Sequence, residues 1–225
     1  MKRLAPGVWR LKKFPGAWIN VYLAEDTLID AGRKWDRRRI FAELEEVEIS
    51  AVALTHVHPD HQGCAKAVCE ARGVPLACHA DDIDAMEGRR SVGATDWWLG
   101  KIYDRLWTGP PHKVDRVLAE GDEVAGFRVL HFPGHAPGLI ALWRESDRLA
   151  LVSDVVYLVD SARLKALPPG EASVPHPAFA WNHQEAKRSL RRLAELEPLV
   201  VGAGHERPLR GDDLRATLEA AAEKY

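Results

Sequence analysis

The chain has 225 residues, and its 31 lysine and arginine residues nearly balance 33 aspartate and glutamate residues, which leaves a formal net charge of -2. This length suits one core, so we expect a single domain over residues 1–225. The balanced charge argues against nucleic-acid binding as the main role, because such domains usually carry a basic excess. Three cysteines cannot complete a disulfide framework and fit a reducing compartment: Cys64, Cys69 and Cys78.

The N-terminus carries charges and prolines where a signal peptide would have an apolar core. No window of the sequence approaches the roughly 18 apolar residues of a membrane span. We therefore expect a soluble, cytoplasmic protein that acts on a small-molecule substrate and has no membrane or nucleic-acid partner.

In the first half of the chain, alternating apolar residues between breaks of proline, glycine or acidic residues predict short strands at 7–11, 19–24 and 27–30. Apolar residues at helical spacing predict a helix over 36–47. The all-apolar run at 51–54 predicts a strand covered on both faces. A helix that ends at Gly73 and a strand at 75–78 follow.

The second half repeats this mixture of elements. Strand patterns stand at 127–130, 139–143, 149–152 and 199–201, and helices are expected at 184–196 and 212–224. Residues 81–116 are less regular, and residues 161–183 are rich in proline and expected to form loops. Two comparable halves of this kind predict an α/β protein in which two sheets pack together with helices outside.

The strongest functional signal is the segment 55–61, which reads Thr-His-Val-His-Pro-Asp-His directly after an apolar strand. Three later strand patterns are each followed by one ligand-type side chain, namely His135, Asp154 and His205. Any one of these histidines alone is best read as a surface residue. The set is better explained by one site, because loops at strand ends display functional groups and burying such groups unpaired is costly. Imidazoles with carboxylates suit zinc, iron or manganese.

On these residues the sequence resembles the metallo-β-lactamase superfamily over most of its length. The signature motif of that family matches His56, His58, Asp60 and His61, and its later ligand positions match His135, Asp154 and His205 in the same order. The resemblance implies a four-layer αββα sandwich with two metal positions. The first would use His56, His58 and His135, and the second Asp60, His61 and His205, with Asp154 bridging both.

The resemblance also implies two divalent metal ions, with Zn²⁺ as first choice and iron or manganese left open by the ligand types. Coordination lowers the pKa of bound water from about 15.7 to about 7. A metal-bridging hydroxide is then expected to attack the carbonyl of an ester, thioester or lactone, with Asp60 as a metal ligand that also orients the water or accepts its proton.

Comparison with the branches of this family restricts the expected activity but does not identify the substrate. True β-lactamases are usually exported and have cysteine or no ligand at the position of Asp154. Hydroxyacylglutathione hydrolases share the ligands but continue into a helical domain, whereas 20 residues follow His205 here. Some acyl-homoserine lactonases have a tyrosine three residues after the bridging aspartate, as Tyr157 is here. Its phenol could donate to a carbonyl oxygen, or it could be an ordinary strand residue.

Two alternatives stay open. Persulfide dioxygenases are similar in their ligands but fill one site with iron, which here would use His56, His135 and Asp154. The other alternative is a metal-binding protein without turnover.

Several residues near the motif have two readings each. Trp97, Trp98, Tyr103 and Trp107 form an aromatic group that is either an apolar wall for a substrate or a homodimer interface or local core. Asp30 and Thr55 either orient ligand imidazoles or, in the case of Asp30, occupy an ordinary turn.

Overall fold

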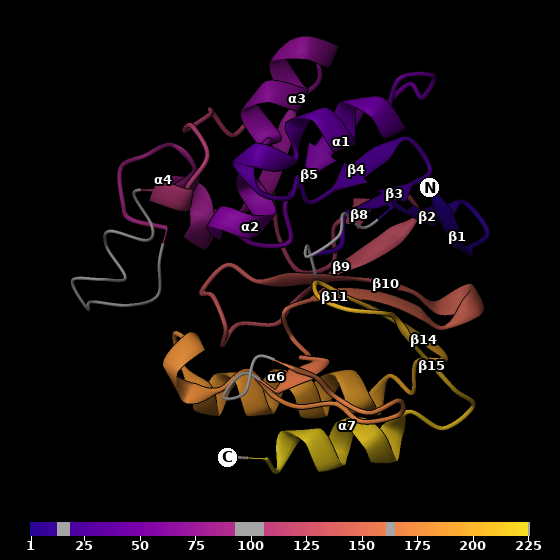
Figure 1. Ribbon diagram of the computed structural model, residues 1–225. Coiled ribbons are helices and arrows are strands. Elements are labelled where there is room, and N and C mark those ends of the chain that lie inside the picture. The colour runs from indigo at the N-terminus through magenta and orange to yellow at the C-terminus, as the bar shows by residue number, and fades with distance from the viewer. Residues whose placement is uncertain (13–18, 93–105, 161–164, 225) are drawn as a thin grey trace.

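The computed structural model describes residues 1–12, 19–92, 106–160 and 165–224. Two sheets lie face to face in it, and helices cover the outer face of each sheet (Figure 1). The layers therefore follow the order α, β, β, α, which confirms the predicted αββα sandwich.

The first sheet comes from the N-terminal half and has the strand order β1-β2-β3-β4-β5-β6-β7. Its first four strands form an antiparallel meander, and β4 to β7 run parallel. Parallel neighbours need crossover connections, and helices supply those after β4 and β5. The strands are β1 (Lys2–Ala5), β2 (Val8–Arg10), β3 (Tyr22–Ala24), β4 (Thr27–Ile29), β5 (Ala51–Ala53), β6 (Leu76–His79) and β7 (Arg116–Leu118).

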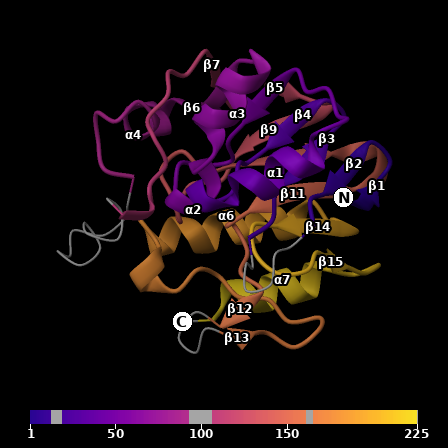
Figure 2. The same ribbon diagram turned by 45° about the horizontal axis from the view of Figure 1, so that its top comes forward.

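The second sheet has the order β15-β14-β11-β10-β9-β8, and its pairs are antiparallel except for β11 with β14. A separate small hairpin is visible beside α7 in Figure 2. The strands are β8 (Glu123–Val124), β9 (Phe127–His131), β10 (Ile140–Arg144), β11 (Leu149–Ser153), β14 (Val200–Ala203) and β15 (Leu209–Arg210), and the hairpin is β12 (Val159–Asp160) with β13 (Lys165–Ala166).

The helices fall into two outer layers. On the side of the first sheet are α1 (Arg37–Glu43), α2 (Pro59–Gln62), α3 (Ala65–Arg72) and α4 (Ile83–Met86), and on the other side are α6 (His183–Glu195) and α7 (Arg215–Ala222). Short 3₁₀ turns are η1 (Lys34–Asp36), η2 (Ala80–Asp82), η3 (Glu145–Asp147) and η4 (Pro177–Phe179). Gly73 ends α3 with a φ of 66°, which glycine adopts readily.

Three buried clusters fill the three spaces between the four layers. Adjacent residues of one strand enter different clusters: Leu28 faces the helices over the first sheet, whereas Ile29 faces the second sheet. This alternation is the period-2 pattern expected of a strand buried on both faces. The cysteines pack as free thiols in the cluster under α3.

The strands and helices with strong apolar patterns were predicted correctly in type. The short strands β1, β7, β8, β12, β13 and β15 were not predicted. The helix expected over 36–47 is shorter, since the 3₁₀ turn η1 precedes α1. The aromatic residues Trp97, Trp98 and Tyr103 lie outside the described residues. Among the described helices, none is long and apolar enough to cross a membrane.

Candidate metal centre

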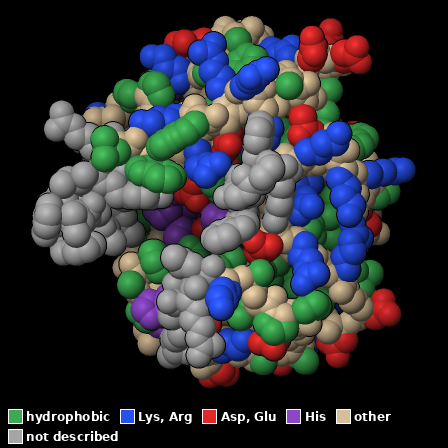
Figure 3. Space-filling model, viewed as in Figure 1, with side chains coloured by type: hydrophobic (Ala, Val, Ile, Leu, Met, Phe, Trp, Pro, Cys, Tyr) green, Lys and Arg blue, Asp and Glu red, His purple; other side chains and the backbone are tan. Residues whose placement is uncertain are grey.

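The structure brings all seven predicted ligands together at one edge of the two sheets. His56 and His58 follow β5, and Asp60 and His61 lie on α2. From the second sheet, His135 follows β9, Asp154 follows β11 and His205 follows β14. Histidine side chains are visible in a recess of the surface beside acidic atoms (Figure 3).

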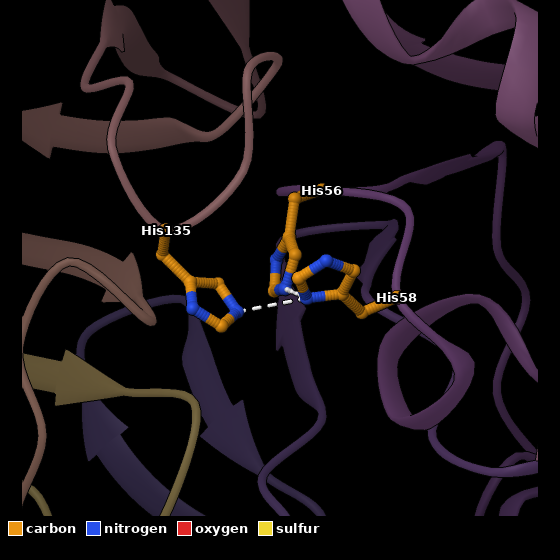
Figure 4. Close-up of side chains that lie close together, drawn as sticks. All are labelled: His56, His58 and His135. Carbon is orange, nitrogen blue, oxygen red and sulfur yellow. Dashed lines mark hydrogen bonds between the residues drawn. The ribbon is translucent and has the colours of Figure 1, made fainter. Parts of the chain in front are cut away.

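A first group of donors consists of three imidazoles that point toward one another (Figure 4). His58 Nδ1 lies 2.8 Å from His135 Nε2 and 3.1 Å from His56 Nε2. All three side chains are held by a loop of the first sheet and a loop of the second, 77 residues apart in sequence. Their nitrogen atoms offer the ligand types that zinc and iron accept.

A second group consists of Asp60, His61 and His205. Asp60 Oδ2 lies 3.5 Å from His205 Nε2 and 3.8 Å from His61 Nε2. Asp154 faces both groups, because its Oδ2 is 3.2 Å from His205 Nε2 and 3.5 Å from His135 Nε2. This is the position that a carboxylate needs if it is to contact two cations.

Other residues fix which nitrogen of each imidazole faces the site. His61 donates from Nδ1 to Asp30 Oδ2 at 2.9 Å, and His135 donates from Nδ1 to the carbonyl oxygen of Phe179 at 2.6 Å. In both rings Nε2 is therefore left for the site, as is usual for metal-binding histidines. Asp30 also accepts the hydroxyl hydrogen of Thr55, at 2.9 Å from Oδ1. The prediction that Asp30 orients a ligand imidazole agrees with this geometry.

Glycines let the chain pass close to the ligands at two points. A Cβ on Gly204, just before His205, would lie 2.1 Å from Asp154 Oδ1 and 2.9 Å from His61 Cε1. Gly134, just before His135, has a φ of 142° and lies against the backbone of Ala186. A side chain at either position would displace a ligand, which explains the Gly-His pairs of the sequence.

The two groups differ in charge. Burial, reinforced by the neighbouring imidazoles, lowers the pKa of His56 well below its usual value and that of His58 to about 3. Burial lowers the pKa of His135 as well. These three rings are neutral at pH 7 and present lone pairs.

In the second group burial also acts to lower the pKa of His61, but the Asp60, Asp30 and Asp154 carboxylates outweigh it and raise that pKa to about 10. Burial opposes ionisation of Asp154, yet His205 and His61 hold its pKa well below the usual value. At pH 7 the second group therefore combines ionised carboxylates with a protonated imidazole, His61, whose proton a bound cation would replace.

Among the buried side-chain atoms of the described residues that have no hydrogen-bond partner, two face the site: His61 Nε2 and Asp154 Oδ1, which lie 3.5 Å apart. In the first group, His135 Nε2 is unprotonated because its Nδ1 donates to Phe179, and it lies 2.8 Å from His58 Nδ1, so both nitrogens can face one cation. Buried polar atoms without partners are costly, so this donor set fits metal ions.

Tyr157 lies at the rim of the centre. Its hydroxyl is 3.5 Å from His135 Nδ1, and its ring centroid is 5.9 Å from that of His205. Burial and the nearby Asp154 and Asp60 carboxylates raise the pKa of Tyr157 well above its usual value. The phenol is therefore neutral and can donate a hydrogen bond.

A further group of donors, His79, Asp81 and His131, lies outside the seven ligands. The two rings stack with centroids 4.0 Å apart and planes 15° apart. Their lone pairs therefore lie in nearly parallel planes, and His131 Nε2 already donates to the carbonyl oxygen of Pro137 at 2.8 Å. Both features make this group a poor match to one metal ion.

Sequence reasoning did not identify the partners of the ligand loops. The carbonyl of Phe179 carries no signal in the sequence. Ser153, with a φ of 47° and its Oγ 3.4 Å from Asp30 Oδ2, turns the chain just before Asp154. Asp82 accepts a hydrogen bond from the peptide nitrogen of Val57 at 2.9 Å, and nothing in its sequence context pointed to this role.

Comparison with known proteins agrees with the fold. The family model described as the metallo-beta-lactamase superfamily matches residues 19–205. Among curated proteins, the probable metallo-hydrolase YflN of Bacillus subtilis (strain 168) is 27% identical over 214 residues, covering 88% of this chain and 81% of that protein. The N-acyl homoserine lactonase AiiB of Rhizobium rhizogenes (strain K84 / ATCC BAA-868) is 28% identical over 174 residues, covering 73% of this chain and 59% of that protein.

Among solved structures, TTHA1623 in a di-iron-bound form is 28% identical, covers 85% of this chain and 89% of that one, and superposes with a TM-score of 0.61. The family match spans residues 19–205, a range that includes strands of both sheets. The chain belongs to the metallo-beta-lactamase superfamily.

Proposed function

We propose that this protein is a dinuclear metal-dependent hydrolase that cleaves the acyl C–O or C–S bond of an ester, thioester or lactone after attack on its carbonyl carbon. The observation that carries the proposal is the arrangement of two three-donor groups with Asp154 facing both. His56, His58 and His135 would hold one ion, and Asp60, His61 and His205 the other. Zn²⁺ is our first choice, with iron or manganese as alternatives.

When bound, two divalent ions supply a Lewis acid and make water acidic enough to act as a nucleophile at neutral pH. The chain's own residues provide the orientation. Asp60 is partly exposed, with 26% of its side chain accessible, so one of its oxygens can accept a proton from water that enters the recess. Tyr157, held neutral, would donate to the substrate's carbonyl oxygen as negative charge grows on it.

We infer the substrate class from the chemistry of the site and from the similarity of the chain to a named lactonase. AiiB is named as a lactonase, and a lactone or thioester carbonyl needs the nucleophile and the hydrogen-bond donor that this site provides. The near-neutral charge of the chain favours such substrates over a phosphodiester polymer.

The test is elemental analysis of protein purified without added metal or chelator, followed by a panel of lactones, thioesters and esters. We expect close to two metal ions per chain and a chelator-sensitive hydrolysis of at least one substrate. His79→Ala serves as a histidine control outside the seven ligands and should keep both properties.

Other results would overturn the proposal. One iron per chain with oxygen uptake on persulfides would favour a mononuclear dioxygenase that uses His56, His135 and Asp154. Two metal ions without any turnover on the panel would favour a binding protein.

A further inference from the structure

Asp82 is a buried carboxylate that lies outside the donor set. It ends the turn η2 after β6 and precedes α4, and 3% of it is exposed. A carboxylate in such a position needs hydrogen-bond donors around it, because burying a charge without partners is costly. The groups that donate hydrogen bonds to Asp82 indicate its role.

Those donors come from the two loops that carry the first group of imidazoles. Asp82 Oδ2 accepts the peptide N–H of Val57 at 2.9 Å, and Val57 stands between His56 and His58. The backbone of Gly138, three residues after His135, lies against the same carboxylate, and its peptide N–H acts to lower the pKa of Asp82. One carboxylate thus joins the loop after β5 to the loop after β9.

Glycine at position 138 permits this contact. A Cβ there would lie 2.5 Å from Asp82 Cγ and 2.8 Å from Oδ1, so the carboxylate rests directly against the backbone of the second loop. The Arg90 guanidinium lies 3.8 Å from Asp82 Oδ1. Burial raises the pKa of the Asp82 carboxyl, and the two peptide donors and Arg90 oppose that shift.

The separation of these loops sets the separation of the imidazoles. His58 Nδ1 and His135 Nε2, which face each other at 2.8 Å, belong to different loops and different sheets. A metal–nitrogen bond is about 2.0–2.1 Å long, so ligand nitrogens that are misplaced bind the ion poorly. The positions of the ligands must therefore be held within about 0.5 Å.

We propose that Asp82 is a positioning residue of the first metal site, which fixes the distance between the loop of His56 and His58 and the loop of His135. This inference rests on the proposed metal centre. Its test measures metal binding rather than hydrolysis, so the two proposals can fail separately: a wild-type protein that binds no metal contradicts the function, and equal binding by the variants contradicts the role of Asp82.

The test compares Asp82→Asn with wild type by titrating the metal-free protein with Co²⁺ against a chromophoric chelator and recording the visible spectrum of the cobalt form. The amide has one acceptor oxygen and would turn an NH₂ group against the second peptide N–H, so the loops should separate. We expect the first Co²⁺ to bind about 10- to 100-fold more weakly, as for partners of metal ligands in general, with an altered absorption spectrum.

Asp36→Asn is the matched control. Asp36 is also buried, at 4% exposed, and accepts a peptide N–H, that of Arg33 at 3.0 Å, but it contacts neither ligand loop through the bonds described. It should lower Tm while keeping the cobalt affinity and spectrum. A purely structural role for Asp82 would give the same pattern in Asp82→Asn, and that result would overturn the proposal.

Gly138→Ala disturbs the same contact from the side of the loop after β9. It provides a second test if Asp82→Asn does not fold. Gly138 is not among the glycines with positive φ, so alanine there acts through its contact with Asp82 rather than through backbone strain. We expect weaker binding of the first Co²⁺ and the same kind of spectral change. Wild-type affinity and spectrum in this variant would contradict the positioning role.

Discussion

The two sheets contribute to the metal centre in different ways. The first sheet supplies four donors within six residues, on the loop after β5 and the short helix α2. The second sheet supplies three donors, each after a different strand and separated by tens of residues in sequence. The first contribution is local, whereas the second exists only because β9, β11 and β14 end at the same edge of one sheet.

The difference shows how the site depends on the packing between the sheets. A local motif can keep its own spacing, but His135, Asp154 and His205 reach it only if the core between the sheets is intact. Residues from both sheets fill that core, for example Ile29 and Val129. Each proposed metal ion would be shared by both sheets, so metal binding is expected to stabilise their association.

The largest effect is expected from the donor that faces both groups. Asp154→Ala should remove both ions and lower kcat/KM at least about 1,000-fold, because several kcal/mol of transition-state stabilisation depends on the metals. The measurement is metal content together with the hydrolysis rate. Asp147→Ala, at the far end of the β10–β11 hairpin, is the control and should keep both. Retention of two ions in Asp154→Ala would show that the sheets hold the metals independently.

A pair of substitutions tests whether the two sheets share the first group of imidazoles as ligands of one metal ion. His58→Ala changes the first sheet and His135→Ala the second, yet both rings belong to one group. Each variant should bind about one ion instead of two, because either loss leaves two nitrogen ligands at that position. Elemental analysis of the two proteins gives the answer. If only one of them lost an ion, the assignment of these rings to a common metal would be wrong.

Tyr157 tests the second sheet's contribution to chemistry rather than to metal binding. Tyr157→Phe should lower kcat about 10- to 100-fold with little change in KM, the size expected for a hydrogen bond to a charged oxygen. Metal content should be unchanged, and this is the internal control. A kcat within twofold of wild type would indicate that the phenol only packs beside His135 and His205.

The smallest effect on kinetics is expected from the aromatic residues Trp35 and Trp107, on the side of the first sheet. Trp107 packs against Trp35 of η1 with ring centroids 4.6 Å apart and planes tilted by 43°, and η1 contacts α2. If these rings border the substrate, Trp107→Ala should raise KM about 2- to 10-fold for substrates with long apolar chains and leave short ones unaffected. Val117→Ala, which changes an exposed apolar residue on β7, is the control. Equal KM values across the chain-length series would leave Trp107 as a packing or interface residue.

The sequence by itself predicted the fold class, and its resemblance to a known family implied seven donors, which the structure brings together. The apolar runs around β5, β9, β11 and β14 predict strands, and a histidine or aspartate within a few residues after each has few structural uses. The all-apolar run at 51–54 also predicted a strand covered on both faces, as the separate clusters containing Val52 and Ala53 confirm. These properties depend on neighbours within a few residues, where sequence patterns carry information.

Only the tertiary structure decided which partners hold the donors in place. The carbonyl of Phe179, the turn at Ser153 and the bridge from Asp82 to Val57 and Gly138 join segments that are 25 to 123 residues apart, or use backbone atoms that every residue has. From the sequence, Asp30 could be either a residue that orients a ligand imidazole or an ordinary turn residue. Its contact with His61 in the structure favours the first interpretation. Such contacts depend on how far apart two loops come to rest after the sheets pack, and a linear pattern of side chains does not encode that distance locally.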